Sequence, residues 1–110
     1  MTTDAGLMNA ILDSMKDPVL FADTEHVIRY LNKAAKRHYK EGEALLGQNV
    51  LDCHNEKSQK MMLEILQAMH QGEDERLITD NKEHRIYMRV VRGEAEEVLG
   101  YYERYEPPIK

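Results

Sequence analysis

The most reactive side chains in this chain belong to two adjacent residues, Cys53 and His54. They directly precede a segment with helical periodicity, and a thiol near a helix N-terminus is often more reactive than usual, which permits redox or metal chemistry. The alternative is that Cys53 is a small buried hydrophobic residue and that His54 packs or hydrogen-bonds where the helix begins. We favour this second interpretation because free cysteine is among the most buried residue types. The sequence has no further Cys/His set at metal-ligand spacing, so we expect no metal site.

A second group with possible chemistry is cationic and consists of Arg29, Arg85 and Arg89. If the strands that carry them pair, a guanidinium and a neighbouring tyrosine can hold a carboxylate. The alternative is a solvated sheet face on which the arginines pair with acids such as Glu103. Strand alternation favours this alternative because it places the arginines opposite the apolar face that carries Ile86.

Composition limits the classes of protein to which the chain can belong. Its 110 residues suffice for one domain, and 42% hydrophobic with 32% charged residues is typical of a globular protein. A formal net charge of -5 argues against nucleic-acid binding. No apolar stretch approaches the ~20 residues of a membrane span, and no secretory signal is visible. A single cysteine fits a reducing compartment, so we expect a cytoplasmic protein that does not contact the membrane.

The first elements must position these residues. Residues 4–15 are expected to form an amphipathic helix that Asp4 caps and that ends before Pro18. Its apolar stripe must be buried against its own chain or against a partner. We therefore predict an interface made by Leu7, Ile11, Leu12 and Met15.

A hairpin is expected next, with strands at 19–23 and 27–31 around Thr24 and Glu25. Alternation places Ile28 and Tyr30 on one face, with Val27 and Leu31 on the other. Asn32 is a good N-cap for a short helix at 33–39.

The remaining pattern predicts helical turns at 41–53, a long helix at 56–71 capped by Asn55, and strands at 77–79, 85–90 and 98–105. The long helix carries an apolar stripe of Met61, Met62, Ile65, Leu66 and Met69. This order of elements predicts an α+β fold, a five-stranded antiparallel sheet with helices on one face. We expect three units: the N-terminal amphipathic helix (1–16), one domain (17–106) and a tail (107–110).

The order and spacing of several short motifs resemble PAS domains over roughly residues 8–105. These motifs are Val19–Asp23, Asn32 followed by Ala34-Ala35, Leu46–Val50, Gly72-Glu73 and Leu99-Gly100-Tyr101. Within PAS domains, the chain is most similar to the bacterial modules of hemerythrin-associated DUF438 proteins. That similarity rests on Arg29-Tyr30, Cys53-His54 with Lys57-Ser58, and Arg85–Arg89. Where that group usually has Pro-Pro after Cys-His, this chain has Asn55-Glu56.

The PAS resemblance implies a sensor fold whose ligand pocket lies between the long helix and the sheet. It does not name a ligand, because PAS domains bind haem, flavin, small acids or nothing. The candidate ligand-binding residues are Ile28, Tyr30, Asn32, Tyr39, Cys53, His54, Met61, Met62, Ile65, Leu66, Ile86 and Met88.

Two cofactors can be compared with the family patterns. The flavin photosensors of the family carry a reactive cysteine directly after Gly-x-Asn, whereas Val50 follows Gly47-Gln48-Asn49 here. Flavin is therefore the less favoured cofactor. The haem sensors carry a proximal histidine near the position of Met61. Haem stays possible with His54 or Met61 as the iron ligand.

We therefore expect a stand-alone, non-enzymatic PAS sensor that binds a small ligand or senses redox state at Cys53. It would act as a homodimer and signal to a separate protein. The crowded tyrosines Tyr101, Tyr102 and Tyr105 fit an interface or a half-exposed edge. The alternatives are a ligand-free structural dimerisation module and a haem-binding gas or redox sensor.

Overall fold

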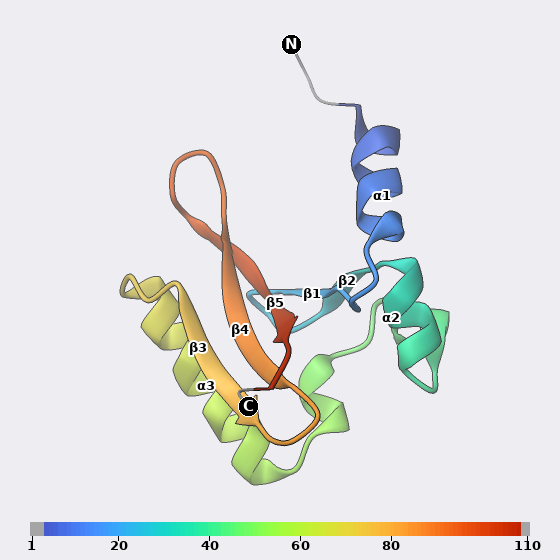
Figure 1. The fold of residues 1–110 in the computed structure, drawn as a ribbon. Helices are drawn as coiled ribbons and strands as arrows, with labels where there is room; N and C mark the ends of the chain where they lie inside the picture. The colour runs from blue at the N-terminus through green and yellow to red at the C-terminus, as the bar shows by residue number, and fades with distance from the viewer. Residues whose placement is uncertain (1–3, 109–110) are drawn as a thin grey trace.

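The computed structural model describes residues 4–108, which form a five-stranded antiparallel sheet in the order β2-β1-β5-β4-β3 (Figure 1). The predicted α+β fold is confirmed, and the last three strands are longer than the sequence pattern suggested. The strands are β1 (Leu20–Asp23), β2 (Ile28–Leu31), β3 (Glu75–Asp80), β4 (Arg85–Arg92) and β5 (Val98–Glu106).

Helical segments connect β2 to β3 and cover one face of the sheet, which we call the inner face. They are α2 (Lys33–His38), α3 (Glu56–His70) and the 3-10 turns η1 (Gly42–Leu45) and η2 (Val50–Cys53). The first helix, α1 (Ala5–Ser14), lies apart from the sheet and beside α2 (Figure 1). No helix in residues 4–108 is long and apolar enough to cross a membrane.

The core lies between the inner face and these helical segments. The apolar stripe of α3 supplies Met62, Ile65, Leu66 and Met69, all buried as predicted, while Met61 is half-buried at the edge of the core. The sheet supplies Leu20, Ala22, Ile28, Leu31, Met88, Val90 and Tyr101.

Asn32 is fully buried, and both the oxygen and the nitrogen of its side-chain amide form hydrogen bonds. Its Oδ1 accepts hydrogen bonds from the backbone amides of Ala35 and Val19, both at 2.9 Å, so the predicted N-cap of α2 is confirmed. Its Nδ2 donates to the carbonyls of Leu12, at 2.9 Å, and Asp17, at 3.1 Å. One amide group therefore joins the end of α1, the start of β1 and the start of α2.

The two other predicted caps are also confirmed. Asp4 accepts from the amide of Gly6 at the start of α1, and Asn55 accepts from the amide of Ser58 at the start of α3. A capping side chain satisfies an amide that has no partner within the helix, which fixes where each helix begins.

The hairpin has one irregularity that the sequence pattern missed. Two adjacent residues of β1 pair with Tyr30 and Ile28, so Arg29 is an extra residue in β2. Such a bulge reverses the alternation of side chains. Ile28 therefore points into the core and Tyr30 to the outer face. The prediction that they share a face was wrong, as was the placement of Leu31 outside, since it is 4% exposed.

α1 falls within the predicted N-terminal unit 1–16, and β5 ends at the predicted boundary of the 17–106 domain. Residues 1–3 of that unit and residues 109–110 of the predicted tail lie outside the described range. The division into three units stays a prediction.

Candidate ligand cavity

A cavity of about 160 Å³ lies between the inner face of the sheet and the segment from α2 to η2. An engineered cavity of about 150 Å³ accepts benzene, so a ligand of that size fits here. Apolar side chains surround a few polar groups, as in most small-molecule sites. The lining residues of this inner cavity are Leu20, Ile28, Tyr39, Leu45, Val50, Cys53, His54, Glu103 and Tyr105.

The structure brings four of the predicted site residues to this cavity, namely Ile28, Tyr39, Cys53 and His54. The others lie elsewhere. Asn32 is engaged as a helix cap, and Tyr30 faces outward because of the bulge. The remaining predicted residues are in the core, at its edge or on the inner face beyond the cavity: Met61, Met62, Ile65, Leu66, Ile86 and Met88.

His54 follows η2 and is held by the backbone. Its Nδ1 lies 2.8 Å from the carbonyl oxygen of Val50. A carbonyl only accepts, so Nδ1 carries a proton and donates it. In the neutral imidazole this leaves Nε2 as an acceptor. The side-chain amide of Gln59 donates to the carbonyls of His54 and Leu51, at 2.9 and 2.8 Å, which ties this turn to α3.

Cys53 is exposed, so the interpretation that it is a buried hydrophobic residue was wrong. η2 is a single turn that buries only Val50, and Cys53 at its end stays near solvent. Cys53 and Leu45 line both the inner cavity and a hollow of about 350 Å³ on the surface. Cys53 therefore marks the place where the cavity approaches solvent.

Glu103 is a second cavity residue whose predicted position was wrong. In β5 it pairs with Met88 of β4 and shares the inner face with Tyr101 and Tyr105. It does not lie on a solvated face with arginines. Burial raises the pKa of its carboxyl, and the nearby His54 opposes that rise. The available signal was its spacing of two residues from a tyrosine on each side.

Tyrosine hydroxyls complete the polar part of the site. The hydroxyls of Tyr39 and Tyr105 lie 3.4 Å apart. The Tyr101 hydroxyl lies 2.7 Å from Nδ1 of His26, beside the cavity lining. Burial raises the pKa of all three tyrosines, so their hydroxyls stay neutral at physiological pH.

The three arginines do not form a carboxylate site. Each pairs with a carboxylate of the chain itself, as the alternative interpretation proposed, although Glu103 is not one of the partners. Arg104 adds to this outer face by binding Glu75 through two nitrogens, both at 2.9 Å, and by pairing with Glu106. The pairs are Arg29–Asp23 at 2.8 Å, Arg85–Glu106 at 2.7 Å and Arg89–Glu75 at 3.7 Å.

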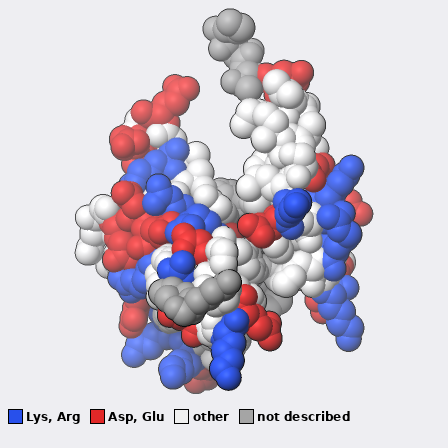
Figure 2. All heavy atoms as spheres, in the orientation of Figure 1, with Lys and Arg blue, Asp and Glu red and all other residues white. Residues whose placement is uncertain are grey.

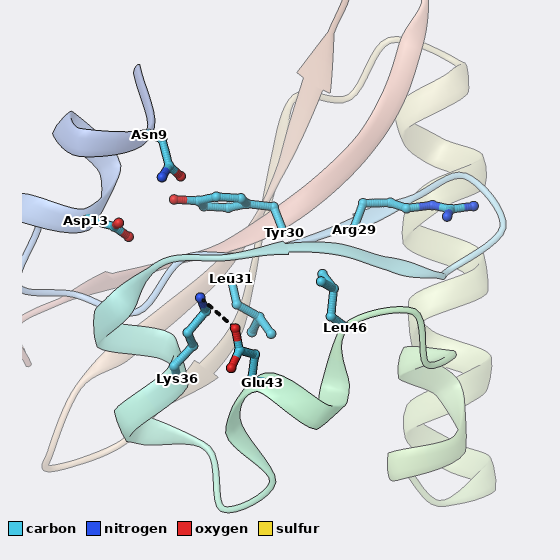
Figure 3. A pocket seen from close by; sticks show the side chains of 8 residues that line it. All are labelled: Asn9, Asp13, Arg29, Tyr30, Leu31, Lys36, Glu43 and Leu46. Carbon is cyan, nitrogen blue, oxygen red and sulfur yellow. Dashed lines mark ion pairs between the residues drawn. The ribbon is translucent and has the colours of Figure 1, made fainter. Parts of the chain in front are cut away.

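A second, polar hollow of about 140 Å³ lies between α1, β2 and the α2–η1 segment (Figure 3). The ring of Tyr30 points toward Asn9 of α1, and Lys36 and Glu43 form an ion pair at 3.5 Å on the other side. Both charged side chains of that pair are exposed. These groups are already solvated, so the hollow offers a ligand less than the inner cavity does.

An apolar groove of about 460 Å³ lies on the outer face of the sheet, next to α1. The hollow between the mostly uncharged α1 and the β4–β5 hairpin is visible in Figure 2. None of the residues of α1 is buried; Leu7 and Ile11 are 54% and 50% exposed. The lining of this outer groove is Leu12, Met15, Val19, Phe21, Tyr30, Val91 and Tyr102.

The inner cavity can be tested for the cofactors that PAS domains hold. The cavity has about the volume of a benzene site. Haem, with its four pyrrole rings, and flavin, with its three fused rings, both require far more space. Of the two candidate haem ligands, His54 lines the cavity and Met61 does not. The cavity therefore does not fit either cofactor. Within residues 4–108, no three His, Cys, Asp or Glu side chains are grouped as metal ligands.

Comparison with solved structures gives several similar folds. The C-terminal domain of a protein from Streptococcus mutans is 21% identical, with a TM-score of 0.77, over 98% of this chain and 87% of that one. The PAS domain of a protein from Colwellia psychrerythraea is 16% identical, with a TM-score of 0.69, over 94% and 97%. A sensory box sensor histidine kinase from Vibrio cholerae is 14% identical, with a TM-score of 0.61, over 90% and 87%.

None of the curated proteins compared with the chain matches it. A protein-family model described as a PAS domain matches residues 8–105, nearly the whole length. The five-stranded sheet, the helices on its inner face and this match lead to one conclusion: the chain belongs to the PAS domain family.

Proposed function

We propose that this PAS domain is a sensor that binds a small molecule in the inner cavity and transmits the signal through dimer and partner contacts. PAS domains are typically sensory modules in bacteria and are generally non-catalytic. The observation that carries the proposal is the cavity itself. Its lining is mainly apolar, and its volume is close to that of a cavity that accepts benzene. Glu103 and His54 add a carboxyl and an imidazole to this lining.

The similar fold in a sensor histidine kinase from Vibrio cholerae supports a signalling role. We also propose that this chain groups with the PAS modules of hemerythrin-associated proteins, for which Cys53-His54 and Arg29-Tyr30 are the supporting motifs. The output would then pass to a separate signalling protein.

Native mass spectrometry of protein purified from cells without denaturation tests the proposal. We expect a mass increase that corresponds to a small molecule. Val50→Phe fills the cavity and should abolish the increase, whereas Leu63→Phe, at an exposed position of α3, should retain it. If the wild-type protein has no added mass, the ligand-free dimerisation module is the better description. If Val50→Phe keeps the added mass, the ligand binds elsewhere and the inner cavity is not its site.

A redox input is a second candidate, which the exposure of Cys53 favours. Oxidation there would add a polar group beside Leu45 and alter the packing of η1 and η2 on the cavity. We expect treatment with dilute peroxide to shift near-ultraviolet circular dichroism in the wild type, and we expect no shift in Cys53→Ser. Equal shifts in both proteins would exclude Cys53 as the sensor.

We propose that the dimer forms through the exposed stripe of α1 and the outer groove of a second copy. The stripe and the groove are both apolar, and an exposed apolar surface of this kind commonly marks an interaction site. Each copy has one stripe and one groove, which suits a two-fold symmetric exchange of α1 helices.

A further inference from the structure

The carboxyl of Glu103 has no partner, unlike those of Asp23, Glu75 and Glu106, and unlike the exposed Asp80 it lines the inner cavity. Glu75 and Glu106 on the outer face pair with arginines. Among residues 4–108, no side chain forms a hydrogen bond or an ion pair with Glu103. An unpaired carboxyl in an apolar cavity is costly, and native proteins usually satisfy such groups. A ligand that supplies the missing partner would remove this cost.

The charges around the cavity indicate which kind of ligand does so. Among the described residues, no lysine or arginine lines it, and its only basic side chain is His54. Nδ1 of His54 is already committed to the carbonyl of Val50. The cavity thus contains one potential negative charge and no permanent positive charge. An anionic ligand would meet Glu103 with like charge, whereas a cation would complement it.

The aromatic lining favours the same ligand. Tyr39 and Tyr105 both line the cavity, and aromatic side chains attract organic cations. Their neutral hydroxyl oxygens also carry lone pairs that can accept from an ammonium group. The volume of about 160 Å³ limits the rest of the molecule to about the size of a benzene ring.

We propose that the inner cavity binds a small organic ammonium ion, with Glu103 as its counter-ion and Tyr39 and Tyr105 around its charged end. The proposal rests on the inner cavity being the ligand site of the sensor, as argued above.

Protons must balance when such a cation binds. Burial raises the pKa of the Glu103 carboxyl in the free protein, and an ammonium ion at hydrogen-bond distance would lower it again. The proton leaves for solvent, so affinity should rise with pH. The other titratable groups facing the cavity are Tyr39, Cys53, His54 and Tyr105.

Isothermal titration calorimetry with three probes of nearly the same shape tests the proposal: benzylammonium, benzyl alcohol and benzoate. We expect benzylammonium to bind the wild-type protein about tenfold more tightly than benzyl alcohol, and benzoate to bind least. Glu103→Gln should remove this tenfold preference, so that benzylammonium and benzyl alcohol bind with similar affinity. Glu94→Gln, which removes an exposed turn carboxylate, should change nothing.

A second measurement needs no variant. Titrations of the wild type at several pH values from 4.5 upward, in buffers of different ionisation enthalpy, should show that a proton is released when benzylammonium binds in the range where the free Glu103 carboxyl is protonated. If benzyl alcohol binds as tightly as benzylammonium, or if no proton is released, the cation proposal is wrong while the cavity remains a ligand site. If none of the three probes binds, both the cation proposal and the proposed ligand cavity fail.

Discussion

Glu103 lines the inner cavity, and the burial of its carboxyl there also affects the stability of the fold. A carboxyl whose pKa is raised by burial holds its proton more tightly in the folded protein than in the unfolded chain. The fold therefore loses stability as pH rises from the ordinary value of about 4.5 through the folded-state pKa. Each unit of pKa difference amounts to about 1.4 kcal/mol. Cavities that retain such groups often do so for binding.

Glu103→Gln should therefore stabilise the free protein at pH 7 to 8. We expect a gain in the free energy of unfolding on the order of 1 kcal/mol or more, because glutamine has no charge to bury. The gain should shrink to zero as pH falls toward 4.5. Urea unfolding of the wild type, Glu103→Gln and the control Glu94→Gln across this pH range gives the comparison. A gain that does not depend on pH would show that Glu103 is not destabilised by ionisation.

At the level of elements, the central contact of the sheet depends on a glycine. Gly100 of β5 pairs with Asp23 of β1 and has a φ of 156°. A Cβ at this position would overlap the carbonyl oxygen of Ala22 and approach Cζ of Phe21 to 2.7 Å. The β1–β5 pairing that joins the hairpin to the rest of the sheet therefore requires a residue without a side chain.

Gly100→Ala should cost about 3 kcal/mol of stability, since backbone atoms of β1 must move to admit the methyl group. Gly72→Ala is the matched control, because Gly72 also has a positive φ, of 113°, but a methyl group there would meet no atom within 4 Å. There we expect a loss of about 1 kcal/mol from backbone strain alone. Chemical denaturation should rank the proteins accordingly. Equal losses of stability in the two variants would mean that the backbone of β1 can move to admit the methyl group at little cost.

At the level of helices and strands, features that depend on neighbouring residues could be predicted from the sequence, and features that depend on strand pairing could not. Caps such as Asn32 and Asn55 act within a few residues, so their types and positions were sufficient. The bulge at Arg29 was not predictable, because it depends on how β1 pairs and one extra residue reverses the faces. This error moved Tyr30 into the predicted site.

Glu103 and Cys53 show a second limit of sequence reasoning. A glutamate in a strand is usually assigned to the solvated face, and a cysteine to the interior. Here the β4–β5 register turns Glu103 inward, and the short η2 turn leaves Cys53 outside. Both outcomes depend on contacts between distant segments, which composition and periodicity do not report. The cavity lies beside η2, whereas the expected pocket lay between the long helix and the sheet, so the sequence located neither its place nor its chemistry.

At the scale of the whole molecule, the exposed stripe of α1 is the main feature that a single copy leaves unburied. Ile11→Glu places a charge in the middle of the proposed dimer contact, where it would have to lose its hydration. We expect the dimer dissociation constant to increase about 30-fold, as for loss of a ~2 kcal/mol hot spot. Analytical ultracentrifugation over a concentration series measures this change.

Ala10→Glu is the control for this experiment, because Ala10 is exposed on the same helix but outside the stripe. It should leave the dimer intact. If both variants weaken association equally, net charge is responsible and the stripe is not. If neither does, the contact lies elsewhere on the molecule.

The four hydrogen bonds of Asn32 provide a single point of attachment around which α1 can rotate. The amide holds the helix near its C-terminal end, at Leu12, and joins it to β1 and α2 at the same point. Ala5 lies seven residues, or about 10.5 Å of helix, from Leu12, so a rotation of about 10° around this point displaces Ala5 by about 1.8 Å. Leu20, which lines the inner cavity, follows directly after Val19, whose amide the same side chain binds. The cavity wall at Leu20 is thus connected to the end of α1 through one peptide bond and two hydrogen bonds of Asn32.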